Sequence, residues 1–252
     1  MYQPKGKLSA CVQAVWSASV NQDSSSSIKR WLQGDACSGI MFNLGGPVYL
    51  DKTPYSGCAV LLPVSKQAQS ITLPPGAQVT GIRLHPGITS SVFGTCYDRP
   101  VAVKDDMQLS EVQAMTQHLI HTPGHYARMT ALYKWLNRVI DFPDNIPTTF
   151  MQMLNTMPKA RLRDLFSADT PLSQRQLERK FQDRMGMTIK QVQRILRVQK
   201  SIHTLKNNPD SNLVELALDQ GFSDQSHMTR EFKQIAKITP RKYSQVISSR
   251  QA

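Results

Sequence analysis

Short apolar runs alternate with glycine- and proline-containing breaks through the first hundred residues of the chain. Between residues 36 and 104 the breaks are Gly45-Gly46-Pro47, Pro54, Pro74-Pro75-Gly76 and Pro86-Gly87. Short runs with this punctuation are typical of an antiparallel sandwich or barrel. We therefore predict a mainly β N-terminal part, with a loop at Ser24–Ser27 and strands at Gly39–Leu44, Val48–Asp51, Cys58–Val64, Gln69–Leu73 and Gln78–His85.

From Leu109 the spacing of apolar residues changes to that of helices. We predict helices at about Ser110–His121 and Tyr126–Asp141, separated by Thr122-Pro123-Gly124. In the second helix one apolar seam with spacings of three, four and three is formed by Met129, Leu132, Leu136 and Val139. Such a seam could pair two subunits, or it could pack against the β domain. Two heptads are too few to define a coiled coil, so both alternatives stay open.

The segment Phe142–Pro147 marks the boundary between two domains, because its two prolines disfavour helix at themselves and at the preceding residue. Everything after it has the pattern of helices and turns. We therefore divide the chain into a β-rich domain, residues 1–145, whose helices at about 109–142 act as a connector, and an all-α domain, residues 146–252.

The all-α part contains an internal repeat with a period of 51 residues. Leu162–Val192 aligns without a gap on Leu213–Tyr243. The alignment places Gln174 on Gln225, Arg179 on Arg230, Phe181 on Phe232 and Thr188 on Thr239. Each copy has a short helix, a polar break and a second helix that opens with a small polar residue, which is the layout of a helix-turn-helix. The long helix predicted at Ile189–Lys206 joins the two units.

The second helix of each unit has the side chains needed to read DNA. In the first unit Ser173 and Gln176 form a capping-box pattern, and in the second Gly221 supplies a turn and Asp224 a cap. Arginine can bind guanine with two hydrogen bonds, and glutamate can accept one from the cytosine amine. The predicted DNA-binding residues are Gln174, Arg175, Glu178, Arg179, Gln225, Ser226, Thr229 and Arg230.

Charge is unevenly distributed along the chain. Residues 1–145 hold 12 basic and 9 acidic side chains, net +3, and residues 146–252 hold 18 and 9, net +9. A local positive field attracts polyanions such as DNA. Basic side chains can also simply hydrate a helical surface, but the repeat favours DNA binding.

Two segments of the repeat resemble the AraC/XylS-type bacterial transcription regulators. They are Ser173–Phe181 with Gly186–Thr188, and Ala217–Lys233 with Ile238–Tyr243. The resemblance covers about residues 150–246. It implies two helix-turn-helix units that read adjacent major grooves of double-stranded promoter DNA, usually to activate transcription by contact with RNA polymerase. The base-facing positions it implies are Arg175, Glu178 and Arg179, and Gln225, Ser226, Thr229 and Arg230.

The N-terminal part resembles, through Met41–Gly45 and Gly81–Gly87, the cupin-like β domains that precede such DNA-binding regions. This resemblance implies an effector or dimerisation domain, and hence a small-molecule effector and a homodimer as partners. The metal ligands of catalytic cupins are missing from this chain. We therefore expect no enzyme activity, no catalytic residues, no metal and no cofactor.

Two other functions compete with sequence-directed regulation. A DNA-repair enzyme with a methyl-accepting cysteine needs an activated thiolate, but Cys11, Cys37, Cys58 and Cys96 stand singly, without zinc-ligand spacing. A non-specific architectural DNA binder needs only the positive charge, although the carboxylate of Glu178 would repel phosphate. The chain has no apolar stretch of the roughly 20 residues that span a membrane, and we expect a cytoplasmic protein.

Overall fold

The computed structural model describes residues 1–89, 92, 97–104, 109–140, 153–154, 156–157 and 173–251. The predicted boundary near residue 145, the first helix of the first repeat copy and Cys96 lie outside these residues. Within them, no helix is both long and apolar enough to cross a lipid bilayer.

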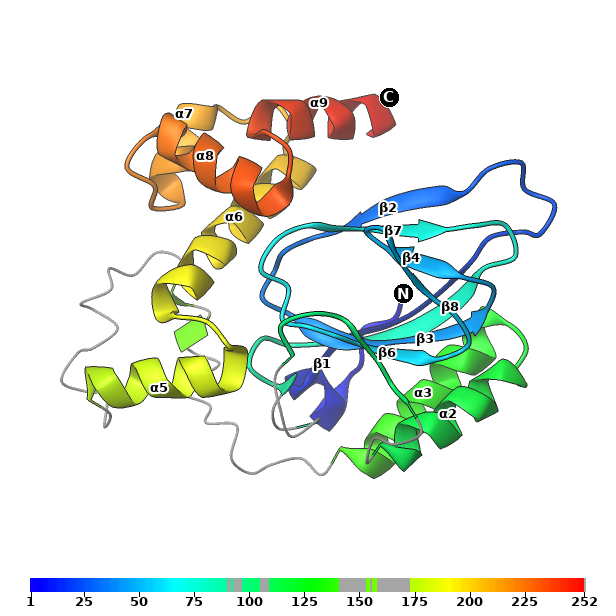
Figure 1. The fold of residues 1–252 in the computed structure, drawn as a ribbon. Helices are drawn as coiled ribbons and strands as arrows, with labels where there is room; N and C mark the ends of the chain where they lie inside the picture. Colours follow the sequence, from blue (N-terminus) through cyan, green and yellow to red (C-terminus); the bar gives the residue numbers. More distant parts are fainter. Residues whose placement is uncertain are drawn as a thin grey trace.

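Two antiparallel sheets form the N-terminal part, and their strands lie in two layers (Figure 1). The five-stranded sheet has the order β1 (Val12–Ser19), β8 (Gln78–Leu84), β3 (Ser38–Gly45), β6 (Ala59–Leu62) and β9 (Val101–Ala102). The four-stranded sheet has the order β2 (Ile28–Leu32), β7 (Gln69–Leu73), β4 (Val48–Leu50) and β5 (Thr53–Tyr55). A 3-10 helix, η1 (Gly6–Ala10), precedes β1. The predicted β-rich fold is confirmed.

The five predicted strands are present as β3, β4, β6, β7 and β8, while β1, β2, β5 and β9 were not predicted. The prediction of Pro54 as a break between strands is wrong, since it lies in β5 and pairs with Tyr49. Because β5 is at the edge of its sheet, the missing proline N–H costs no ladder hydrogen bond. Gly81, in the inner strand β8, has no room for a side chain, because a Cβ there would lie 2.5 Å from the Trp16 ring.

Helices α2 (Ser110–Ile120) and α3 (His125–Val139) cover the outer face of the five-stranded sheet (Figure 1). Leu132 and Leu136 are fully buried in the core beneath them, and Met129 and Val139 pack against it. The apolar seam is therefore used to pack α3 on the β domain, which was one of its two predicted uses. A second core, between the two sheets, is formed by Met41, Val48, Val60, Ile71, Val79 and their neighbours.

The C-terminal part contains α5 (Gln174–Met185), α6 (Ile189–Asn207), α7 (Leu213–Asp219), α8 (Gln225–Ala236) and α9 (Pro240–Gln251). The repeat is kept in the structure: α8 begins and ends 51 residues after α5, and α9 begins 51 residues after α6. Gly186 after α5 and Lys237 after α8 both have left-handed backbones, with φ of 59° and 60°. The predicted linker helix is α6.

The β sandwich contacts the C-terminal helices through two of its loops. Ala36 and Val64 are buried within the core of the helical part. The Gln199 side chain of α6 donates to the Gly34 carbonyl at 2.7 Å, and the Ala68 N–H donates to the Ile235 carbonyl of α8 at 2.6 Å. Helices α6 and α8 are thus both hydrogen-bonded to loops of the β domain.

Candidate nucleic-acid interface

Helix α5 presents the first group of predicted DNA-binding residues. Its N-terminus is fixed by a capping box, in which the Gln176 N–H donates to Ser173 Oγ at 3.3 Å and the Ser173 N–H donates to Gln176 Oε1 at 2.8 Å. Leu177 and Phe181 are buried as predicted. The side chains on the opposite face are exposed, namely Gln174, Arg175, Glu178 and Arg179.

Two members of this group hold each other in place. Gln174 Nε2 donates to Glu178 Oε1 at 3.0 Å, one helical turn away. The carboxylate of Glu178 is thereby oriented before any partner arrives, and its second oxygen has no hydrogen bond within the described residues. Lys190, which was not predicted, lines the same hollow as Arg175 and Arg179 at the start of α6.

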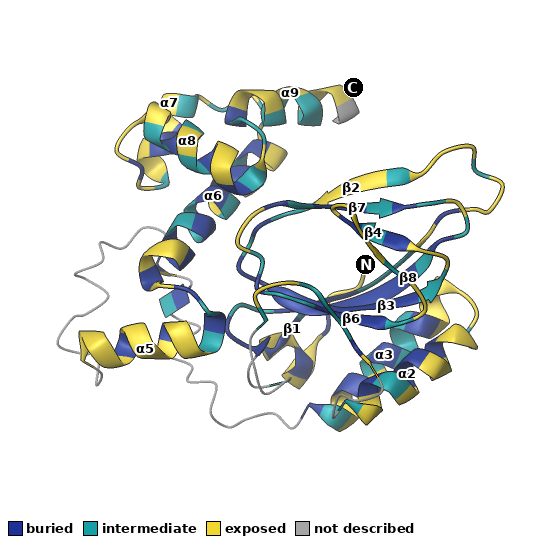
Figure 2. Cartoon of the chain, viewed as in Figure 1, coloured by how far each residue is buried: buried dark blue, intermediate teal, exposed yellow. Residues whose placement is uncertain are grey.

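Helix α8 presents the second group. Asp224 accepts a hydrogen bond from the His227 N–H at 2.7 Å, and this bond lowers the pKa of the carboxyl group, so that the cap is charged at neutral pH. Gly221 has the positive φ predicted for its turn, 78°. Met228 and Phe232 are buried, whereas Gln225, Ser226 and Arg230 are exposed and Thr229 is half-buried. Figure 2 shows that α8 has both buried and exposed residues along its length.

The eight predicted residues therefore form two groups on two helices, and α5 and α8 lie toward opposite ends of α6 (Figure 1). The 19 residues of α6 span about 28 Å at 1.5 Å per residue. Successive major-groove entries on one face of DNA are about 34 Å apart. For both units to bind one face of DNA, a tilt of the units or a bend in the DNA would have to make up this difference.

Sequence reasoning missed the side chains that join the second unit to the linker helix. Arg194 of α6 binds Glu231 and Gln234 of α8, with Arg194 Nη2 2.6 Å from Gln234 Oε1. The partners are 37 and 40 residues apart, so no local pattern connects them. The only signal in the sequence is the pair of acceptors at positions three apart on a helix.

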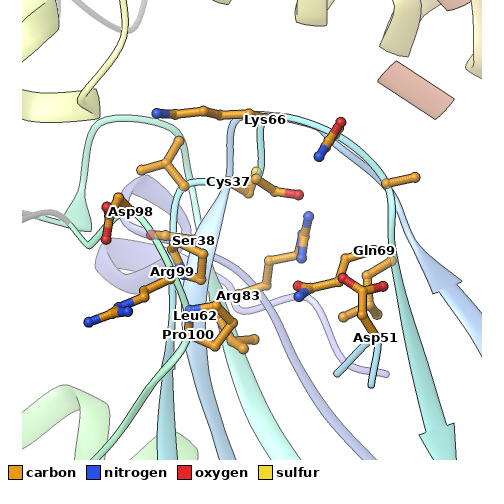
Figure 3. A pocket seen from close by; sticks show the side chains of 16 residues that line it. Cys37, Ser38, Asp51, Leu62, Lys66, Gln69, Arg83, Asp98, Arg99 and Pro100 are labelled. Atoms are coloured by element: carbon orange, nitrogen blue, oxygen red, sulfur yellow. The ribbon is translucent and has the colours of Figure 1, made fainter. Parts of the chain in front are cut away.

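The β domain holds a separate cavity of about 230 Å³ whose wall carries several charged side chains (Figure 3). Arg83 is one of the lining residues and donates from Nε to Asp35 Oδ2 at 3.0 Å. Residues 62–69, which include the loop between β6 and β7, form one side of the cavity, and this loop contacts α8 through Ala68. The other polar or charged residues on the wall include Ser38, Asp51, Lys66, Gln69, Asp98 and Arg99.

The cysteines and histidines of the described residues do not form a reactive or metal-binding cluster. Burial raises the pKa of the thiols of Cys11, Cys37 and Cys58, which keeps them protonated. No group of three or more potential metal ligands occurs in the described ranges. His125 lies against β1, with Nδ1 2.8 Å from Ser17 Oγ.

Two segments of the chain match models of known protein families. Residues 166–245 match the model of a helix-turn-helix domain, and residues 1–99 match a domain of unknown function, DUF6597. The curated proteins contain no match to the chain.

Among solved structures, the chain is similar to ToxT from Vibrio cholerae, with 14% identity, a TM-score of 0.49 and coverage of 92% of this chain and 96% of ToxT. A second ToxT structure, bound to (E)-4-(8-methylnaphthalen-1-yl)but-3-enoic acid, has 13% identity, a TM-score of 0.49 and coverage of 92% and 97%.

Proposed function

We propose that the chain is a DNA-binding transcription regulator of the AraC type, an activator whose helices α5 and α8 read adjacent major grooves. The match of residues 166–245 to a helix-turn-helix domain supports this proposal. The observation that carries this proposal is the repeat of the two helices. Both have a polar N-cap, a buried face ending in Phe181 or Phe232, and an exposed face with an arginine at the equivalent position, Arg179 or Arg230.

The exposed residues supply the chemistry of sequence reading. The residues proposed to contact DNA are Gln174, Arg175, Glu178 and Arg179 on α5, and Gln225, Ser226, Thr229 and Arg230 on α8. Their arginine, glutamine and glutamate side chains can distinguish base pairs by hydrogen bonds in the major groove. The net charge of +9 over residues 146–252 supports binding to phosphates in addition.

Selection of bound duplexes from a random library tests the proposal. We expect one enriched sequence that the full chain binds at least about 10³-fold more tightly than random DNA. Because Lys and Arg side chains displace counterions, log K is expected to fall by about 0.9 per phosphate neutralised as log salt rises. An architectural binder would give the salt dependence without an enriched sequence, and that result would contradict the proposal. Deletion of the gene is expected to lower the transcripts next to the bound sites.

The same proposal excludes catalytic turnover and assigns no metal or cofactor to the chain. It is supported by the raised thiol pKa values, because a methyl-accepting cysteine must be a thiolate. Contact with RNA polymerase and a cytoplasmic location belong to the same proposal. Both are expected of a bacterial activator, because it acts on RNA polymerase at promoters of the chromosome in the cytoplasm.

We further propose that residues 1–145 are an effector and dimerisation domain and residues 146–252 the DNA-binding domain. The cavity beside Arg83 supports a small-molecule effector, since its wall includes the loop that contacts α8. Small polar compounds that raise the unfolding temperature of the full chain, but not that of an Arg83→Ala variant, would identify such a ligand.

The homodimer needs a surface other than the apolar seam, because Leu132 and Leu136 are buried inside the chain. In sedimentation experiments, we expect residues 1–145 to form a dimer and residues 146–252 to be monomeric. A monomer of the N-terminal fragment at tens of micromolar would contradict the dimer.

A further inference from the structure

One face of the second recognition helix is held by polar side chains of the linker helix. His227, Glu231 and Gln234 lie at positions i, i+4 and i+7 of α8, on the side that faces α6. Arg194 of α6 binds two of them: its Nε lies 2.5 Å from Glu231 Oε2, and its Nη2 lies 2.6 Å from Gln234 Oε1. The Glu231 carboxylate is largely buried, with 14% of its side chain exposed.

The contact of Arg194 with Glu231 and Gln234 restricts the rotation of α8 about its own axis as well as its distance from α6. A guanidinium group is planar and rigid, so two of its nitrogens that bind acceptors about one turn apart fix α8 about its own axis. Further positive charge faces Glu231 from Arg197 on α6, and His227 Nε2 lies 3.7 Å from Glu231 Oε1. A largely buried carboxylate needs such partners, which makes the arrangement costly to change.

Rotation of α8 bears directly on DNA reading, because Arg230 and Thr229 immediately precede Glu231 on the helix. A helix with its side chains has a radius of about 5–6 Å, so that a rotation of about 20° moves a side-chain tip by about 2 Å. In a hydrogen bond to a base edge, the donor–acceptor distance can exceed about 3.2 Å by only a few tenths of an ångström. The orientation of α8 therefore decides which base edges Arg230 can reach.

The first recognition helix has a different side chain at the position equivalent to Glu231. Shifting by the repeat period of 51 places Glu231 on Lys180, which is exposed on α5. A lysine cannot accept a hydrogen bond from an arginine, and its charge would repel one. The apolar faces of the two helices are equivalent, with Phe181 and Phe232 both fully buried. The two units thus share their apolar faces and differ in the side chain at the position of Glu231.

We propose that Arg194, Glu231 and Gln234 form a clamp that fixes the second recognition helix on the linker helix, so that the second half-site must stand at one spacing and rotation relative to the first. Here Arg194, Glu231 and Gln234 are positioning residues, since they act through Arg230 and its neighbours. This inference rests on the proposed function. It explains why the two half-sites would have to lie at a fixed distance from each other.

The test uses the full chain and the duplex that wild type selects, together with duplexes that have one base pair inserted or removed between the half-sites. One base pair changes the rotation between half-sites by about 35°. We expect wild type to prefer the selected spacing strongly. In Glu231→Gln, which keeps the size of the side chain and removes its charge, the affinity ratio between selected and shifted spacing is expected to fall about tenfold.

Two further variants separate the clamp from general effects on the fold. Arg194→Lys keeps the charge but cannot bind two acceptors with a rigid fork, and it is expected to lower the same ratio. The double variant Arg194→Lys/Glu231→Gln should lose no more than the larger single loss, because both changes remove one contact. Glu215→Gln, an equal change of charge on the exposed face of α7, is the matched control and should leave the ratio unchanged.

Two results would overturn the clamp. One is a wild-type spacing ratio in both Glu231→Gln and Arg194→Lys. The other is a loss of affinity that is equal at all spacings, because a role in folding alone would lower binding uniformly. Failure of the proposed function is distinguishable, since wild type itself would then select no sequence, and the clamp would fall with it.

Discussion

Replacement of Arg230 by alanine is expected to weaken binding to the selected DNA by about 1–3 kcal/mol, the range for loss of a bidentate contact with a base. Arg230 is exposed on α8, and its helix is held by a charged N-cap and by a buried face. The equivalent change in the first unit, Arg179→Ala, should cost no more than Arg230→Ala. The reason is that the resemblance to the AraC/XylS-type regulators extends over a longer segment in the second unit, Ala217–Lys233, than in the first, Ser173–Phe181. Mobility-shift titration of both variants measures the two losses.

The control for this prediction is discrimination between bases. If Arg230 reads a base, the alanine variant should become tolerant of substitution at one base pair while it keeps its preference at the others. A loss of affinity that is the same for every sequence would instead assign Arg230 to a phosphate. Wild-type affinity in Arg230→Ala would show that this side chain does not contact DNA.

Replacement of Phe232 by alanine is expected to lower the free energy of unfolding by about 3–5 kcal/mol. Phe232 has no exposed surface, lies in the core shared by the C-terminal helices and packs edge-on against Tyr243, with ring centroids 5.9 Å apart. Its removal would leave a cavity beneath α8 and cost the ring contact as well. Urea unfolding of the full chain, followed by far-ultraviolet circular dichroism, measures the loss.

Phe181→Ala is the matched variant, because Phe181 is the equivalent residue of the first unit and is equally buried. Phe232→Leu keeps most of the buried volume and should cost clearly less than Phe232→Ala. A loss below about 1 kcal/mol in Phe232→Ala would contradict a close-packed core at this position.

The repeat, its caps and its buried faces could be predicted from the sequence because they depend on local physics. A capping box needs residues only three positions apart, as in Ser173 and Gln176, and a buried helical face needs apolar residues at i and i+4, as in Leu177 and Phe181. The five strands bounded by glycine or proline were predicted for the same reason. Strand β1 was not predicted because neither glycine nor proline directly flanks it, unlike the strands that were predicted.

The tertiary structure decided how these elements are used. The apolar seam of α3 looks the same in sequence whether it pairs two chains or covers a sheet, and only its burial in the core beneath the β sheet separates the two uses. The contacts of the loop residues Ala36 and Ala68 with the C-terminal helices, and the bond between Arg194 and Glu231, join residues far apart in the chain.

The sequence by itself therefore determined the β-rich class of the N-terminal part and the helical class of the C-terminal part. It also predicts two helix-turn-helix units and the eight side chains proposed to contact DNA. It could do so because helix periodicity, capping and turn formation depend on residues within a few positions of one another. The orientation of α8 on α6 and the contact between the domains were decided by the tertiary structure alone. They depend on contacts between side chains that are far apart in the sequence, and short-range sequence patterns do not predict such contacts.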